Sequence, residues 1–391
     1  MKRNLFALYL IKLSKWFTLV MPIIVLFYED HGLKLQDIFI LKSVYSVTAV
    51  ILEIPSGYLA DVWGRKKCLI TGCMLFFAGY ACYSLTGTFS YFILAEILLG
   101  CGQTLVNGAD SALLYDTTVE YGKESVYLRY EGRITMVGNF AEAIAGVIGG
   151  FLAAYSLRLP FYGQAVIAFS GIPAAFMLKE LGSRKSVQGP FSEIMRIIKY
   201  ALVTNKHICY NILYSGMIGS ATLMMAWFVQ PVLIHIDTPT SHFGIIWTAL
   251  NLTAGTAAFY AHRMERRLGM QRMNGLILAC IVGGYIALAC NLTHVSLLIL
   301  LVFYIFRGFA TPILKGYINQ ITFSDMRATV LSIRNFIIRL FFAAIAPYIG
   351  WLNDMYSLKT ALFVSAGIIF VPGLLFLILL HLHHPTGLSR E

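Results

Sequence analysis

Long apolar stretches recur along the whole chain and alternate with short polar segments. Twelve of these stretches are long enough to cross the hydrocarbon core of a membrane as a helix, which takes about 20 residues. They cover approximately residues 5–28, 35–60, 68–87, 91–115, 128–154, 159–179, 207–235, 241–261, 271–290, 295–318, 328–350 and 358–380. This pattern predicts an all-α membrane protein with twelve transmembrane helices.

The longest connection between two apolar stretches divides the chain into two halves of six predicted helices. Between Phe191 and Thr204 this connection alternates apolar residues with Lys and Arg at helical spacing, as in helices that lie flat on a membrane surface. We therefore expect an N-terminal six-helix bundle at 1–180, a cytoplasmic linker with an amphipathic helix at 181–206, and a C-terminal six-helix bundle at 207–391.

The composition excludes a soluble enzyme, a disordered protein and a nucleic-acid-binding protein. Only 13% of the residues are charged and 58% are hydrophobic, whereas a soluble globule carries about a quarter charged residues. Basic residues gather on the side of the N-terminus, and the opposite loops hold only Lys34, Arg158 and Lys359. Because Lys and Arg mark the cytoplasmic side, both termini are expected in the cytoplasm, and a bacterial inner membrane is the expected location.

Motifs of catalysis and of cofactor binding do not occur in the sequence. There is no GxxxxGK[ST] loop for a nucleotide, no HExxH, no Ser–His–Asp order and no CxxC pair. We therefore expect neither an enzyme nor a bound cofactor or metal, and no direct use of ATP.

The segment GYLADVWGRKK at 57–67 lies between the second and third predicted helices. It resembles the hallmark loop of the major facilitator superfamily, G-x-x-x-D-x-x-G-R/K-R/K, and the chain resembles that family's secondary transporters over its whole length. The resemblance implies a gating role for Gly57, Asp61, Gly64 and Arg65. Asp61 would accept hydrogen bonds from the N-terminus of the helix that starts near Arg327, and the basic residues can bind lipid phosphates. Val62 departs from the Arg that the family often has.

Two further motifs are similar to those of proton-coupled drug exporters in this family, but both are altered. The R-x-x-x-G pattern of the fourth helix reads Glu96-Ile-Leu-Leu-Gly100, and G-P-x-x-G-G of the fifth helix reads Ala145-Gly146-Val-Ile-Gly149-Gly150. For 145–150 we favour close helix packing.

Four charged residues fall near the middle of predicted membrane helices: Lys15, Glu142, Arg307 and Arg339. An ionisable group at this depth is costly and usually faces a cavity or a partner. Because one acid neutralises only one of three bases, a water-filled or anion-occupied cavity is expected. Polar residues at helical spacing also form stripes on the fourth and tenth predicted helices. The predicted substrate-binding residues are Lys15, Gln103, Asn107, Tyr304, Arg307, Thr311 and Arg339.

The leading hypothesis is a secondary transporter that moves a small organic solute by alternating access and is coupled to protons. Glu142 is the first candidate for the proton-carrying residue and Asp110 the second, because a carboxylate in a membrane cavity can titrate near neutral pH. The resemblance to drug and metabolite exporters favours export. The alternatives are a proton-coupled importer of an anionic nutrient or siderophore-like chelate and, ranked lower, a scramblase or receptor on the same fold. The expected partners are the solute, which can be anionic, protons and membrane lipids, and a monomer is expected.

Overall fold

The computed structural model describes residues 1–122, 127–180, 191–323 and 326–383, and the described residues form helices and no strands. Ten of the helices are long and apolar enough to cross a membrane. The chain divides into two compact units, and each is described by itself. Unit 1 comprises residues 1–188 and 238–249, and unit 2 comprises residues 189–237 and 250–391.

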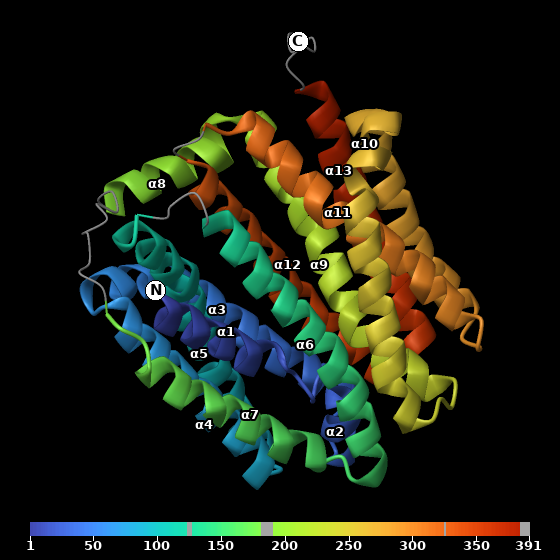
Figure 1. The fold of residues 1–391 in the computed structure, drawn as a ribbon. Helices are drawn as coiled ribbons and strands as arrows, with labels where there is room; N and C mark the ends of the chain where they lie inside the picture. Colours follow the sequence, from blue (N-terminus) through green and yellow to red (C-terminus); the bar gives the residue numbers. More distant parts are fainter. Residues whose placement is uncertain (123–126, 181–190, 324–325, 384–391) are drawn as a thin grey trace. The chain divides into compact units, whose positions relative to one another are not determined.

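Unit 1 is built from seven helices and the first turns of an eighth (Figure 1). α4 packs against both α5 and α7, α3 packs against α5, and α1 contacts α5, α6 and α7. The helices are α1 (Lys2–Trp16), α2 (Ile24–Asp30), α3 (Leu35–Val62), α4 (Arg65–Leu85), α5 (Phe89–Glu120), α6 (Tyr127–Tyr155), α7 (Leu159–Phe176) and the start of α10 (Thr240–Cys290).

The first apolar stretch, expected as one helix over 5–28, is broken between α1 and α2. Pro22 has no backbone N–H and its ring obstructs the preceding turn, so a helix cannot continue through it undisturbed. Within the break, the Leu19 backbone N–H donates to the buried Gln164 side chain of α7 at 2.7 Å. A Cβ at Gly149 would lie 1.9 Å from the Leu19 carbonyl oxygen, so only glycine allows α6 to approach the break so closely.

The small residues at 145–150 in α6 also contact the start of α10. A Cβ on Gly150 would lie 2.7 Å from the backbone nitrogen of Gly244, and the Thr248 hydroxyl donates to the Ala143 carbonyl oxygen at 3.0 Å. The helix packing expected for this segment is therefore present.

Unit 2 contains α8 (Phe191–Lys199), the π-helix η2 (Tyr200–Thr204), α9 (Lys206–His235), the remainder of α10, α11 (Ser296–Ile321), α12 (Arg327–Met355) and α13 (Leu358–Leu382). α9 lies at its centre and packs against α11, α12 and α13. Ile197 of α8, Ile208 and Ile212 of α9, and Ile333 of α12 share one apolar core.

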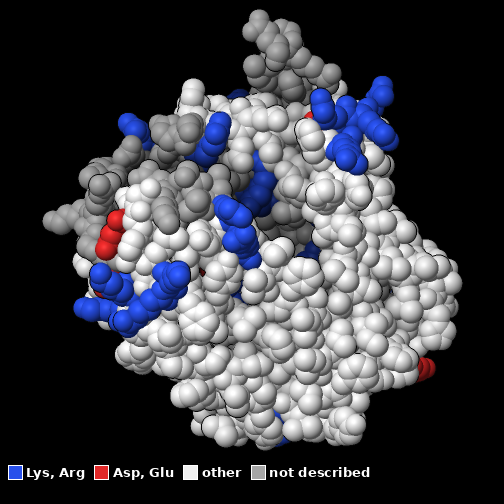
Figure 2. Space-filling view, in the orientation of Figure 1, with Lys and Arg blue, Asp and Glu red and all other residues white. Residues whose placement is uncertain are grey.

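The eighth and ninth predicted spans lie in the single element α10, which turns back at Gly269 (Figure 1). Gly269 has non-helical dihedral angles, φ 75° and ψ 163°. Arg263, Arg266, Arg267 and Arg272 are exposed around this turn. Figure 2 shows a cluster of Lys and Arg there, whereas most of the visible surface carries no charged residue, as expected of helices that face lipid.

The ten candidate spans and the twelve predicted ones differ at these two places. α1 and α2 are each too short to be a candidate span, and α10 is a single candidate span although it contains two of the predicted ones. Twelve membrane crossings, the topology of the termini and the boundaries of the two bundles stay predictions. Residues 181–190 of the predicted linker lie outside the described residues.

Candidate functional site

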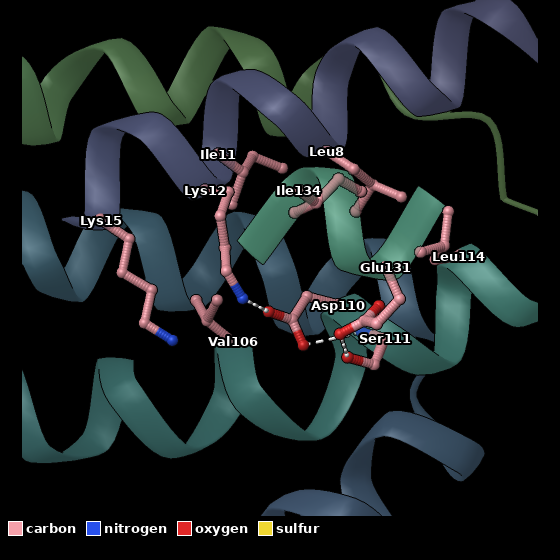
Figure 3. A pocket seen from close by; sticks show the side chains of 10 residues that line it. All are labelled: Leu8, Ile11, Lys12, Lys15, Val106, Asp110, Ser111, Leu114, Glu131 and Ile134. Carbon is pink, nitrogen blue, oxygen red and sulfur yellow. Dashed lines mark hydrogen bonds and ion pairs between the residues drawn. The ribbon is translucent and has the colours of Figure 1, made fainter. Parts of the chain in front are cut away.

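A polar cluster in unit 1 joins α1, α5 and α6 (Figure 3). The Lys12 ammonium lies 3.6 Å from the Asp110 carboxylate. The Ser111 backbone N–H donates to that carboxylate at 2.7 Å, and its hydroxyl donates to Glu131 at 2.9 Å. These charged groups lie among apolar helices, where an unpaired charge is costly. Each of them has an opposite charge or a hydrogen bond within reach, which lowers that cost.

Lys15 extends the cluster along α1, and its ammonium donates a hydrogen bond to the Asn107 side-chain oxygen of α5. A small cavity is lined by the polar residues Lys12, Lys15, Asp110, Ser111 and Glu131, and its apolar wall includes Leu8, Ile11, Val106 and Ile134. A second small cavity shares Ile11, Lys15 and Val106 with the first and is also lined by Ser14, Cys73, Phe76 and Ala168. Lys15 therefore borders both cavities.

The acids of the cluster act on Tyr127, which lies just before the membrane-spanning part of α6. Burial raises the pKa of the Tyr127 phenol above its usual value, the carboxylates of Glu131 and Asp110 raise it further, and a hydrogen bond with Ser111 opposes them. The phenol therefore stays protonated beside the carboxylates.

Gln103 and Glu142 lie farther along the same helices. Gln103 occupies the turn of α5 before Asn107, and it is partly buried. Glu142 is partly buried on α6, about 16 Å beyond Glu131 at 1.5 Å per residue. The proton-carrying role of Glu142 stays a prediction.

The loop between α3 and α4 is held by carboxylates from two other parts of unit 1. The Arg65 guanidinium pairs with the Asp116 carboxylate of α5. Glu180, which follows α7, accepts hydrogen bonds from the backbone N–H groups of Arg65 and Lys66 at 3.1 and 3.0 Å, which places an anion at the positive end of α4. Gly64, at φ 104°, makes the turn before α4, a conformation that glycine adopts without strain.

Two other predicted gating residues lie in α3. Gly57 is partly buried there. The side chain of Asp61 lies outside the described residues, so its predicted contact stays a prediction.

A second buried network holds Glu96, the residue that replaces Arg in the altered exporter motif. Its carboxylate pairs with the Lys42 ammonium of α3 and accepts hydrogen bonds from the hydroxyls of Tyr28 and Tyr83 at 3.0 and 2.6 Å. Lys42 also donates to the Tyr28 hydroxyl at 3.0 Å. All four side chains are at most 7% exposed, so the network links α2, α3, α4 and α5 in the interior of the unit.

The remaining predicted substrate-binding residues lie in unit 2. The Arg307 guanidinium lies 4.8 Å from the ring centroid of Tyr304, its neighbour on α11, a distance typical of a cation–π contact. Thr311, one turn farther along α11, is exposed, and Arg339 is partly buried on α12. Within the described part of the chain, the buried Nη1 atom of Arg307 has no hydrogen-bond partner.

The structure therefore brings three predicted site residues, Lys15, Asn107 and Asp110, together beside adjoining cavities. Sequence reasoning did not single out Glu131, Lys42, Gln164 or Glu180 as functional or structural partners. A polar or charged residue within an apolar stretch is a signal that the sequence does contain. The partners of these residues come from other helices, so the sequence does not reveal the pairs. Among the described residues no group of His, Cys, Asp and Glu could hold a metal ion.

Comparison with solved structures identifies the fold. The nucleoside transporter NupG superposes with a TM-score of 0.80 at 15% sequence identity, over 96% of this chain and 98% of that one. A D-xylose-proton symporter superposes with a TM-score of 0.73 at 13% identity, over 96% of both chains. At such low identity the likeness concerns the fold alone.

Sequence comparison finds bacterial relatives. Quinolone resistance protein NorA of Staphylococcus aureus (strain MRSA252) is 26% identical over 164 residues, and the match spans 41% of this chain and 41% of that relative. Multidrug resistance protein 2 of Bacillus subtilis (strain 168) is 23% identical over 371 residues, which are 91% of this chain and 89% of the relative. The model of the Major Facilitator Superfamily matches residues 6–347. The chain therefore belongs to the Major Facilitator Superfamily.

Proposed function

We propose that the chain is a secondary active transporter, rather than an enzyme, that moves a small organic solute across a bacterial inner membrane by alternating access. The single observation that carries this proposal is the polar cluster of Lys12, Lys15, Asp110 and Glu131 around a cavity between apolar helices, with Asn107 as the acceptor for Lys15. Charged groups at a cavity inside a membrane helix bundle mark a pathway for a solute or an ion, and family membership supports the same conclusion.

The proposal includes a topology of twelve crossings in two six-helix bundles with both termini in the cytoplasm. In it, α1 and α2 together make the first crossing, and α10 makes the eighth and ninth on either side of Gly269. The exposed Arg residues at that turn would then lie in the cytoplasm, in agreement with the preference of basic loops for that side.

Proton coupling is assigned first to Asp110. Its side chain is 15% exposed and that of Lys12 is 13% exposed, so water can reach both. Protonation of the Asp110 carboxylate would remove the charge that attracts Lys12 and free the lysine to interact with a solute in the cavity. Glu142, the first candidate from the sequence, becomes the second candidate for proton coupling.

Export is the favoured direction. Two sequence relatives carry names that refer to quinolone resistance and multidrug resistance, and the export of a toxic compound is one way to resist it. The import of an anionic nutrient is the second candidate. It is supported by Arg307, whose buried Nη1 atom has no acceptor among the described residues.

The proposal is tested by counterflow in proteoliposomes that contain the purified full chain. Vesicles loaded with an unlabelled compound should transiently accumulate the same labelled compound from outside, first for a set of quinolones and then for organic anions. Accumulation of a compound supports a carrier. If no compound exchanges while a fluorescent lipid moves between leaflets, the chain is a scramblase and the proposal is wrong.

A further inference from the structure

Three cations of unit 1 that are largely shielded from water each form an ion pair with a carboxylate. Lys42 pairs with Glu96, Lys12 with Asp110, and Arg65 with Asp116. Such pairing is expected, because a charge removed from water costs several kcal/mol unless an opposite charge and hydrogen bonds compensate it.

Arg334 of unit 2 departs from this pattern. It lies on α12 and is 4% exposed. Its Nε–H donates to the Ser215 hydroxyl of α9 and its Nη1 donates to the Asn335 side-chain oxygen at 3.3 Å. Both acceptors are uncharged, and no carboxylate among the described residues forms an ion pair with the Arg334 guanidinium.

Among the described side chains of the helices around Arg334, no carboxylate pairs with it. α9, α11 and α13 contain neither Asp nor Glu. The Asp354 of α12 lies about 30 Å along the helix from Arg334 at 1.5 Å per residue. Glu265 of α10 accepts a hydrogen bond from the Tyr317 hydroxyl at 3.5 Å. The described side chains of α8, which also contacts α12, add the cations Arg196 and Lys199.

A second cation lies near Arg334. Lys315 of α11 is exposed, and its positive charge interacts with that of Arg334. α11 and α12 run in opposite directions on either side of a short connection and contact each other. Lys315 and Arg334 are separated from that connection by similar numbers of residues, so they lie at similar depths. Two like charges at one depth repel each other, and an anion between them would remove that repulsion.

We propose that Arg334 and Lys315 form a binding site for the carboxylate or phosphate group of a small soluble anion. A guanidinium has five N–H donors, and two of those of Arg334 are engaged by Ser215 and Asn335. Three donors remain, which suffices for the two parallel hydrogen bonds that a carboxylate or phosphate accepts. Ser215 and Asn335 hold the guanidinium plane, and Lys315 supplies a second charge from the exposed side.

This site deepens the proposed transport function, on which its role as a cargo site rests, by naming an anionic substrate class. Anion binding itself does not require transport. It is therefore measured on the purified full chain in an uncharged detergent, with inorganic phosphate and succinate as probes. Thermal unfolding is followed as each probe is increased, with sodium chloride keeping the ionic strength constant. A ligand that binds the folded state raises the unfolding temperature in a saturable way.

The expected result is a saturable rise in unfolding temperature with phosphate, succinate or both. Arg334→Lys and Lys315→Gln should each raise the half-saturating concentration by about tenfold or more, because each removes charge-assisted hydrogen bonds to the anion. Arg272→Gln removes an exposed cation of the same unit and should leave that concentration unchanged. If Arg334→Lys does not fold, Lys315→Gln decides, since an exposed side chain contributes little to folding.

The proposal is overturned if the unchanged protein shows no saturable rise, or if both variants respond as Arg272→Gln does. It is also overturned if phosphate and succinate have no effect while phosphatidylglycerol nanodiscs stabilise the chain more than phosphatidylcholine nanodiscs, because the ligand is then a lipid headgroup. Anion binding without counterflow would retain this site and reject the proposed transport function.

Discussion

The Lys12 ammonium of α1 lies 3.6 Å from the Asp110 carboxylate of α5, beside a cavity in unit 1. Lys15 lies one turn away on the same helix and contacts Asn107, one turn from Asp110. Two cations of one helix therefore meet the polar face of another. In the proposed mechanism the charge of Asp110 would decide whether Lys12 stays paired or interacts with a solute in the cavity.

The first prediction concerns Asp110→Asn. The amide keeps the size of the side chain but can neither carry a proton nor pair with Lys12 as an anion. Accumulation driven by a pH gradient should fall by at least about tenfold, which corresponds to about 1.4 kcal/mol, while substrate exchange without a gradient persists. Uptake and exchange are both measured in proteoliposomes.

Asp237→Asn is the matched control for that variant. It makes the same chemical change at a turn with φ 52°, a conformation that Asn tolerates well, and should leave both activities unchanged. If Asp110→Asn accumulates substrate as the control does, Asp110 does not couple transport to protons.

The second prediction separates Glu142 from Asp110. If Asp110 carries the proton, Glu142→Gln should retain pH-driven accumulation in the same vesicles. Loss of accumulation with exchange preserved would instead assign the proton to Glu142. Loss of both activities at normal expression would make Glu142 a structural or substrate-binding residue.

The third prediction concerns the buried pair of Lys42 and Glu96. Glu96→Gln leaves the Lys42 ammonium buried without its counter-ion, which should cost about 3–5 kcal/mol of stability. The double variant with Lys42→Met removes the remaining charge and should recover part of the loss. Thermal unfolding in detergent measures both. Equal unfolding temperatures for Glu96→Gln and the unchanged protein would show that this pair does not stabilise the fold.

The fourth prediction concerns Arg307 and an anionic substrate. The buried Nη1 atom of Arg307 lacks an acceptor among the described residues. Arg307→Lys keeps the charge but loses the two-pronged geometry with which a guanidinium binds a carboxylate. It should weaken the binding of an organic anion, and Arg307→Ala should weaken it more. In a competition assay, organic anions that do not compete while neutral or cationic compounds do would exclude an anionic substrate.

The sequence predicts much of the fold and part of the site, because both depend on helical spacing. Apolar stretches give the helices within a few residues, and Asn107 and Asp110 share one helical face because their spacing matches a turn. The depth of Lys15 follows from the rise per residue, but this rise does not tell which helix the side chain meets.

The rest depends on contacts between helices that are far apart in sequence. The break after Trp16 is stabilised by Gln164 of α7 and by the close approach of Gly149 of α6, and neither is a local signal. The altered motif drew attention to Glu96, but no spacing rule pairs it with Lys42 on α3. In the same way, nothing near Arg334 in the sequence indicates that Ser215 of α9 holds its side chain in the interior.

The most direct test of the central claim is accumulation of a compound that passes the counterflow assay, measured with and without an imposed pH gradient across the vesicle membrane. For a proton-coupled transporter the gradient should drive the compound above its equilibrium distribution, its reversal should reverse the movement, and a protonophore should abolish it. A compound that exchanges in counterflow but equilibrates identically with the gradient, without it and in reverse would contradict proton-coupled transport.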